Sequence, residues 1–205
     1  MNTNDNNNVP EQEQIALYDM DQTLCDYTGR MEECLDSLSS PNEESYTVDW
    51  GKDVPPHIER RMDLIKSQPG WWESLPILRL GMDIFHASKN IGFTNHILTK
   101  GPYKTDSAWS EKRRWCKAHL LAGTPLTITE DKGLMYGKVL VDDYPPYVER
   151  WLKWRSNGLV IMPAHSYNED FEHPNVIRYD GENRVQIVDA LRAAFSRKPG
   201  EKLTI

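Results

Sequence analysis

The chain has 205 residues, a formal net charge of −7 at pH 7, 39% hydrophobic residues and 27% charged residues. This length allows one domain with a buried core, with or without a small insertion, and the composition is that of a soluble globular protein. No apolar run approaches the roughly 20 residues of a membrane span, and the acidic balance argues against a broad nucleic-acid-binding surface.

The first 14 residues are polar and lack the basic start and apolar middle of a signal peptide. We therefore expect residues 1–14 to be a disordered tail and the protein to be cytoplasmic. Cys25, Cys34 and Cys116 are far apart and form no CxxC pair, which argues against a disulfide framework and against a zinc site.

Apolar runs alternate with helical patterns along the remainder of the chain. In the first half, strands are predicted at 15–18 and 95–99, and helices at 28–40, 55–69 and 80–89. Alternation of this kind favours an α/β fold, in which helices cover both faces of a Rossmann-like parallel sheet.

The second half continues the alternation. Its clearest helix is predicted at 107–121, with Trp115, Ala118 and either Leu120 or Leu121 facing inward. The basic run at 112–117 is expected on the solvated side of that helix. Further strands are predicted at 125–129, 137–141 and 159–162, and a closing helix at 186–195.

Polar residues follow four of these strands, where a parallel sheet places its ligands. They are Asp19 and Asp21, Thr99, Lys132, and the pair Asp142 and Asp143. Each has an ordinary alternative as a loop, a helix cap, a surface lysine or a turn. All four in order, each after an apolar strand, indicate a catalytic edge.

The chemistry of such a cluster is coherent. Carboxylates at Asp19, Asp21, Asp142 and Asp143 would repel one another without a cation, and hard oxygen ligands suit Mg²⁺. Asp19 could then attack a bound phosphate to form an aspartyl-phosphate, with Asp21 protonating the leaving oxygen and later activating water. Fixed donors bind the other phosphoryl oxygens, and the candidates for that task are Thr99 and Lys132.

These residues resemble the motifs of the haloacid dehalogenase-type phosphatases. DMDQT at 19–23 matches the first motif, DxDxT/V, and Thr99 after an apolar strand matches the second. Two lysines could fill the third, and Lys132 is preferred because Lys138 begins a strand and would point away from the catalytic edge. The acidic pair after VLV at 139–141 matches the fourth.

Within that superfamily the chain looks most like the 5′(3′)-deoxyribonucleotidases over residues 15–195. Shared features include WWESLP at 71–76 and AWSEK at 108–112. The resemblance implies that Asp21 also gives its backbone carbonyl to the metal and that Asp143 supplies the carboxylate of the acidic pair. It further implies a core formed by residues 15–27 and 77–205, and a small helical cap at 28–76.

The candidate substrate-binding residues are Tyr27, Trp50 and Lys100, and the resemblance implies that an aromatic residue at the position of Tyr27 helps to form the nucleoside pocket. Trp50, Trp71 and Trp72 either form the core of the cap or, in the case of Trp50, stack on a nucleobase. His96 and His165 form no spaced metal pair and are expected to be structural. Aromatic residues after the acidic pair either pack inside or cover a homodimer interface, and these are Tyr147, Trp151 and Trp154.

Three departures from the family pattern leave base and sugar preference open. Lys100, Gly101 and Pro102 follow Thr99 where Ser-Pro is common, Asp106 stands where a substrate-binding lysine is expected, and Tyr144-Pro145 replaces Arg-Pro. The predicted function is hydrolysis of (deoxy)nucleoside monophosphates. The alternatives are a phosphatase for another small phosphomonoester or a polynucleotide end, and a non-catalytic nucleotide-binding module.

Overall fold

The computed structural model describes residues 14–198 and 200–204, so residues 1–13 of the expected tail lie outside the described part. Six strands form one sheet in the order β3-β2-β1-β4-β5-β6, and every neighbouring pair is parallel. The strands are β1 (Ile15–Tyr18), β2 (Thr94–Thr99), β3 (Leu126–Ile128), β4 (Val139–Val141), β5 (Leu159–Pro163) and β6 (Val176–Tyr179). The predicted α/β fold with a Rossmann-like parallel sheet is confirmed.

The helices connect these strands in the predicted alternation. The α-helices are α1 (Tyr27–Ser37), α2 (Pro56–Ser67), α3 (Arg79–Ile91), α4 (Asp106–His119), α5 (Pro145–Leu152) and α6 (Arg184–Ser196). The described residues also form single 3₁₀ turns, which are η2 (Trp72–Ser74), η3 (Lys132–Leu134) and η4 (Ser166–Asn168). Strand β6 and helix α5 were not predicted from the sequence.

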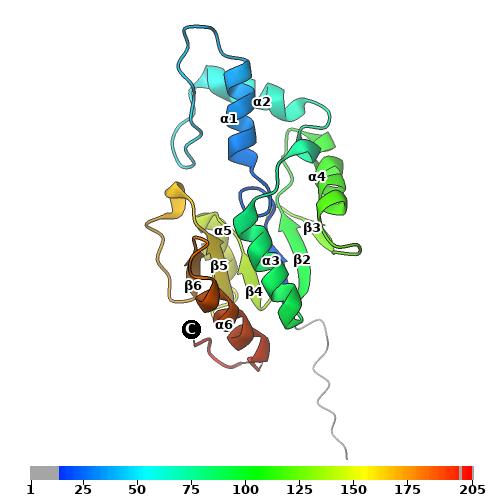
Figure 1. The fold of residues 1–205 in the computed structure, drawn as a ribbon, viewed down its shortest axis with the longest axis vertical. Coiled ribbons are helices and arrows are strands. Elements are labelled where there is room, and N and C mark those ends of the chain that lie inside the picture. Colours follow the sequence, from blue (N-terminus) through cyan, green and yellow to red (C-terminus); the bar gives the residue numbers. More distant parts are fainter. Residues whose placement is uncertain (1–13, 199, 205) are drawn as a thin grey trace, which may run out of the picture.

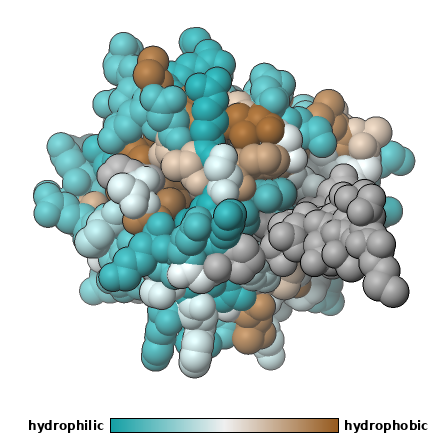
Figure 2. Space-filling view, turned by 90° about the horizontal axis from the view of Figure 1, so that it is seen from below, coloured by the Kyte–Doolittle hydropathy of each residue, from teal (hydrophilic) through white to brown (hydrophobic). Residues whose placement is uncertain are grey.

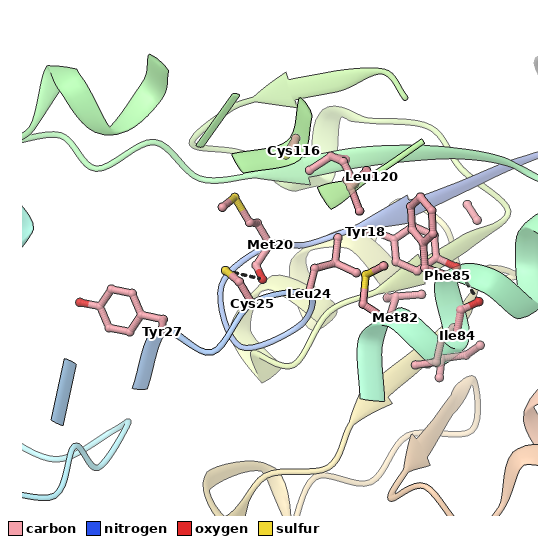
Figure 3. Packing of buried hydrophobic residues seen from close by; sticks show 14 of the residues in the cluster. Tyr18, Met20, Leu24, Cys25, Tyr27, Met82, Ile84, Phe85, Cys116 and Leu120 are labelled. Carbon is pink, nitrogen blue, oxygen red and sulfur yellow. Dashed lines mark hydrogen bonds between the residues drawn. The ribbon is translucent and has the colours of Figure 1, made fainter. Parts of the chain in front are cut away.

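Two hydrophobic clusters lie on opposite faces of the sheet, because successive side chains of a strand alternate between its faces. Tyr18 belongs to the larger cluster with residues of α3, α4 and α6, whereas Leu17 belongs to the smaller cluster with Trp151 of α5. Figure 3 shows Tyr18 against Phe85, where the tyrosine hydroxyl donates to the carbonyl oxygen of Ile84 at 3.2 Å. This bond satisfies the polar end of an otherwise apolar core residue.

Helix α4 differs from its prediction in which side chains it buries. Trp115 and Leu120 are buried as expected, but Ala118 is exposed and Leu121 is 53% exposed. Lys112 is fully buried, so the expectation that the whole basic run lies on the solvated side is wrong. Burial of a lysine requires compensating partners, and they lie at the site described below.

The helices between β1 and α3 extend beyond the carboxyl ends of the strands (Figure 1). This segment is fixed to α4 through Glu111, whose carboxylate accepts the backbone N–H groups of Gly70 at 2.9 Å and of Trp72 at 3.1 Å. Trp115 adds a bond from its indole nitrogen to the carbonyl oxygen of Leu75 at 2.7 Å. Helical residues therefore cover the edge of the sheet where the polar motifs were expected.

The opposite end of the molecule, seen in Figure 2, is mainly hydrophilic, with hydrophobic residues in separate patches. Of the aromatic residues after the acidic pair, Trp151 is fully buried, Tyr147 is partly buried and Trp154 is 63% exposed. Packing therefore accounts for Trp151. Among the described residues, no helix has the length and apolar character to cross a membrane.

Candidate active site

Three carboxylates meet where β1 and β4 end. The backbone N–H of Asp19 donates to the carbonyl oxygen of Val141 at 2.8 Å, which holds the two strand ends together. As a result Asp19, Asp142 and Asp143 each place one carboxylate oxygen within 4.8 Å of the others, and all three residues are buried. Burial raises the pKa of Asp142 to about 6 and raises the pKa of Asp143 well above its ordinary value.

Lys132, at the start of η3, reaches into this acidic cluster. Its Nζ lies 2.8 Å from Oδ1 of Asp19 and 2.7 Å from Oδ2 of Asp142, and its side chain is 1% exposed. Burial alone would lower the pKa of Lys132, but the two carboxylates outweigh it and keep the ammonium charged. The other candidate, Lys138, donates to the carbonyl oxygens of Phe195 and Arg197 near the end of α6.

The charges of this cluster do not balance. With all three carboxylates ionised, the cluster and its one ammonium would carry a formal charge of about −2 in a buried volume, which is costly without a further cation. A divalent ion with oxygen preference would supply that charge. The residues present therefore fit a site for such an ion.

Asp143 is held in place by two hydroxyl groups. Thr23 Oγ1 donates to its Oδ1 at 2.7 Å, and the Tyr167 hydroxyl donates to its Oδ2 at 2.5 Å. Asp142 is occupied differently, because its oxygens accept from Lys132 and from the backbone N–H of Tyr144 at 3.1 Å. Neutral donors on Asp143 leave its charge available, whereas the charge of Asp142 is paired with Lys132.

The turn after β1 gives the first motif its shape. Gln22 has φ +56°, the one positive φ outside glycine in the described residues, and the backbone N–H groups of Leu24 and Cys25 both donate to the carbonyl oxygen of Met20. Gly81 lies directly against this turn, where an added Cβ would stand 1.8 Å from the carbonyl oxygen of Thr23. Only glycine allows α3 to begin so close to the motif.

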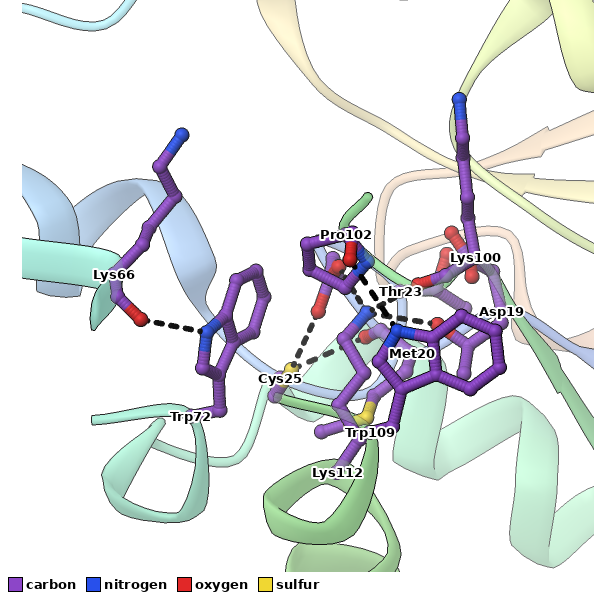
Figure 4. Close-up of polar contacts among 12 residues, drawn as sticks. Asp19, Met20, Thr23, Cys25, Lys66, Trp72, Lys100, Pro102, Trp109 and Lys112 are labelled. Atoms are coloured by element: carbon purple, nitrogen blue, oxygen red, sulfur yellow. Dashed lines mark hydrogen bonds and ion pairs between the residues drawn. The ribbon is translucent and has the colours of Figure 1, made fainter. Parts of the chain in front are cut away.

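Asp21 and Thr99 share a partner that sequence reasoning missed. The buried Nζ of Lys112 lies 2.6 Å from Oδ2 of Asp21, 3.0 Å from Oγ1 of Thr99 and 2.9 Å from the carbonyl oxygen of Lys100. Figure 4 shows Lys112 reaching up from α4, with the Lys100 side chain extending away from it. The structure thus joins the motif residues after β1 and β2 through one ammonium group.

A cavity of about 1200 Å³ opens above these groups. Its lining includes candidate catalytic carboxylates, aromatic rings and lysines: Asp19, Asp21, Asp143, Trp50, Tyr144, Tyr147, Lys52, Lys100 and Lys104. Tyr27 is not part of this lining. It is 6% exposed and packs behind Trp50 with a ring-centroid distance of 5.6 Å.

The three tryptophans divide between the two predicted roles, core packing and a place in the cavity wall. Trp71 and Trp72 are 5% and 3% exposed and pack on Tyr27, as expected for a core. Trp50 lines the cavity, and its indole nitrogen donates to Thr28 Oγ1 at 2.9 Å, which fixes the ring. Trp50 therefore presents a held aromatic face to any molecule that enters.

Two expected structural histidines have ordinary partners. His96 bonds Thr127 Oγ1 at 2.8 Å on the sheet, and burial lowers its pKa. His165 bonds the carbonyl oxygen of Gln22 at 2.7 Å and stacks on Tyr167, which holds Asp143. His165 thus supports both the first-motif turn and the acidic pair from behind.

The loop after Thr99 packs closely against α4 at Gly101. An added Cβ on Gly101 would stand 2.3 Å from the indole ring of Trp109, and that ring donates from its nitrogen to the carbonyl oxygen of Pro102 at 3.3 Å. The loop therefore folds onto α4 at a residue without a side chain. This arrangement leaves Lys100 facing the cavity.

Comparison with known families decides which class of protein carries this site. The sequence profile described as "5′ nucleotidase, deoxy (Pyrimidine), cytosolic type C protein" matches residues 13–190, which contain every motif discussed above. The chain belongs to this family. It is accordingly a hydrolase of phosphoric monoesters in the haloacid dehalogenase-like superfamily, and the predicted resemblance is confirmed.

Solved structures show the same fold at low sequence identity. A haloacid dehalogenase-like hydrolase from Burkholderia xenovorans is 15% identical, with a TM-score of 0.53 over 86% of this chain and 98% of that chain. A haloacid dehalogenase-like family hydrolase from Xanthomonas campestris is 13% identical, with a TM-score of 0.50 over 91% of this chain and 99% of that chain. A search of curated protein sequences finds no significant match.

Proposed function

We propose that this family member is a Mg²⁺-dependent nucleotidase that hydrolyses (deoxy)nucleoside monophosphates through an aspartyl-phosphate. The observation that carries the proposal is the position of Asp19, beside the charged Lys132 at the floor of a cavity with Trp50 in its wall. A nucleophile and an aromatic face for a base thus line one cavity, and a buried cation for the phosphoryl group contacts the nucleophile.

The metal would be held by the carboxylates of Asp19 and Asp143 and the backbone carbonyl of Asp21, with Asp142 serving to hold Lys132. When bound, Mg²⁺ neutralises phosphate charge and orients the phosphoryl group. Lys132 then stabilises negative charge that develops on the phosphoryl oxygens, because a buried ammonium acts in a low dielectric.

The remaining steps fall to groups on the two turns. A carboxylate oxygen of Asp19 attacks phosphorus, the bond to the nucleoside oxygen breaks, and Asp21 gives that oxygen a proton. Asp21 then takes a proton from the water that cleaves the acyl-phosphate. The hydroxyl of Thr99 donates to a phosphoryl oxygen in both steps.

Residues 28–76 are proposed as a cap that closes over the phosphate and excludes water. Within it, Trp50 would stack on the base, supported from behind by Tyr27, while Lys100 approaches from the loop after β2. Base stacking on an aromatic ring is worth about 1–3 kcal/mol and tolerates different bases. Stacking on Trp50 therefore does not select the sugar, and selection between ribose and deoxyribose would depend on other residues of the cavity wall.

The remaining proposals concern the setting of the enzyme. A cytoplasmic location fits the cytosolic type named in the family description, and the net charge of −7 fits the absence of broad nucleic-acid binding. A homodimer, if formed through the aromatic residues after the acidic pair, would use Trp154, which is exposed. Tyr147 lines the cavity, so we do not propose it for the dimer interface.

A phosphate-release screen with Mg²⁺ tests the function. We expect turnover of nucleoside monophosphates, both 5′ and 3′ and with ribose or deoxyribose, above turnover of sugar phosphates. The second candidate, a phosphatase for a larger phosphomonoester or a polynucleotide end, is favoured by the size of the cavity and by the four lysines that line it. An oligonucleotide with a terminal phosphate therefore belongs in the panel. If the protein hydrolyses sugar phosphates but no nucleotide, the nucleotidase proposal is wrong.

Mg²⁺ is expected to stabilise the fold more at pH 7.5 than at pH 5. Burial and the neighbouring carboxylates raise the pKa of Asp143, a proposed ligand, well above the value of about 3.9 in an unfolded chain. Between these values the metal-free folded state binds more protons than the unfolded state, so its stability falls as pH rises. Mg²⁺ competes with those protons for the same carboxylate. The stability that Mg²⁺ restores is therefore larger at the higher pH, where the protons have been lost.

Thermal unfolding with and without Mg²⁺ at both pH values measures this difference. The variant Asp143→Asn provides the control and should respond weakly to the metal at either pH. Equal shifts in Tm at pH 5 and pH 7.5 for the unmodified protein would contradict the assignment of the acidic cluster as the metal site.

A further inference from the structure

One buried charge near the site is not explained by metal or phosphate binding in the scheme above. Lys112 has no exposed side-chain surface, and its Nζ has three acceptors: Asp21 Oδ2, Thr99 Oγ1 and the carbonyl oxygen of Lys100. An ammonium has three N–H donors, so all of them are used. Trp72 covers the group, with its ring centroid 4.9 Å from Nζ.

Packing alone gives no reason for a lysine at this position. Replacing a buried ion pair by an apolar side chain of similar volume is often neutral or stabilising. The neighbours of Lys112 on its helix face, Ala108 and Trp115, are themselves fully buried and would accept such a side chain. The ammonium is instead joined to groups on the turns after β1 and β2, which carry the proposed proton donor and phosphate ligand.

The three bonds have direct consequences for those two groups. Because Lys112 donates to Oγ1 of Thr99, the hydroxyl proton of Thr99 is directed to another acceptor, which is the orientation a phosphate ligand needs. One oxygen of Asp21 is held by Lys112 while the residue still lines the cavity, with its side chain 25% exposed. Its carboxyl group is therefore fixed in position at the cavity wall.

We propose that Lys112 is a positioning residue for catalysis: its ammonium holds the Asp21 carboxyl group where it can transfer a proton to the leaving oxygen and ties it to the Thr99 loop. This inference rests on the proposed function, since it assigns Lys112 a task in that reaction. Lys112 itself does not touch the substrate. Its effect on the rate should therefore depend on how much the leaving group needs a proton.

The variant Lys112→Met tests this dependence with two substrates. Nucleosides leave as poor alkoxides and need the proton, whereas p-nitrophenolate leaves without one. Both substrates share the later hydrolysis of the acyl-phosphate, so the comparison uses kcat/KM, which covers only the steps up to departure of the leaving group. General acid–base catalysis contributes about 10²–10⁴-fold, so kcat/KM for a nucleoside monophosphate should fall about 100-fold or more, and kcat/KM for p-nitrophenyl phosphate less than about tenfold. Lys117→Met, at an exposed position on the same helix, is the matched control and should leave both rates unchanged.

A double-mutant cycle separates action through Asp21 from a general effect. In an Asp21→Asn background, Lys112→Met should add less than about a threefold further loss on the nucleotide, because groups that act as a unit are not additive. Equal losses on both substrates, no loss at all, or full additivity with Asp21→Asn would each overturn the proposal.

Folding and function are kept apart by two further measurements. Thermal unfolding checks each variant, and Lys112→Gln provides a second variant with a polar end. Failure of both to fold would assign Lys112 a structural role and overturn the proposal. The rates of the unmodified enzyme test the nucleotidase function, whereas the variant-to-parent ratios test Lys112. A crystal structure of Lys112→Met, in which Asp21 should leave its present position, needs no turnover, and an unmoved Asp21 would count against the proposal.

Discussion

The substitution Asp19→Asn is expected to lower phosphate release by about 10³-fold or more, while the protein remains folded. An amide has almost the same shape as a carboxylate but lacks the charge that attacks phosphorus. The change also removes one of the two carboxylates that contact Lys132, whose other contact, with Asp142 at 2.7 Å, remains to keep the ammonium paired. Steady-state release of phosphate with Mg²⁺, with circular dichroism as the check of fold, measures this effect.

The matched control is Asp170→Asn, the same chemical change at an exposed aspartate after η4. It should retain the activity of the unmodified protein. Trapping provides a second readout, since a rapid acid quench of the parent enzyme should yield a phosphorylated protein that Asp19→Asn does not form. An Asp19→Asn variant with full turnover would refute the covalent mechanism while leaving the family assignment intact.

The sequence predicted the parts of this fold that depend on local pattern. Short apolar runs such as 15–18 and 159–162 were identified as strands, because buried parallel strands are apolar throughout. Strand β6 (Val176–Tyr179) lies at the edge of the sheet with alternating burial, and it was missed because Arg178 interrupts its short hydrophobic run. Helix α5 has eight residues and begins with Pro145, so its few turns offered little periodic signal.

The sequence could predict those site residues that lie at or just after the carboxyl ends of strands, but not their partners from other elements. Every motif residue could be placed because a parallel sheet brings carboxyl ends to one edge. Tyr167 and Lys112 were missed because their partners, Asp143 and Asp21, lie 24 and 91 residues away in sequence. Distances of that kind are set by packing of whole elements, which local patterns do not encode.

A signal for Lys112 was nonetheless present. Ala108 and Trp115 are four residues before and three residues after it, so all three share the inward face of α4. A charged residue on the apolar face of a predicted helix means either that the face has been assigned wrongly or that the charge is buried with partners. Because Lys112 belongs to the basic run at 112–117, it was assigned to the solvated face with the rest of that run, although its spacing from Ala108 and Trp115 places it on the inward face.

The second large effect is expected at Lys132, where the change Lys132→Met should cost both activity and stability. Its ammonium is buried between Asp19 and Asp142, so its removal leaves carboxylates without a counter-charge. Breaking a buried pair in this way costs about 3–5 kcal/mol of unfolding free energy. Loss of a fixed donor for the phosphoryl oxygens should also lower kcat by about 10²–10³-fold.

The stability loss carries a pH signature that a simple packing defect would lack. Without Lys132, burial raises the pKa of Asp142 with no nearby ammonium to oppose it, so the folded state holds its proton to a higher pH. The loss should therefore be small at pH 5, where the Asp142 carboxyl group is protonated, and grow toward pH 8. Mg²⁺ should recover part of it by supplying the missing positive charge.

Urea unfolding of Lys132→Met and the parent protein across this pH range measures the difference, with Lys89→Met, an exposed lysine at the end of α3, as control. The control should show the pH dependence of the parent protein. A stability loss for Lys132→Met that is the same at every pH would mean that its methylene chain matters more than its charge. In that case the cluster would not be held together by the Lys132 ammonium, and the charge argument for a divalent ion at Asp19 and Asp143 would fail with it.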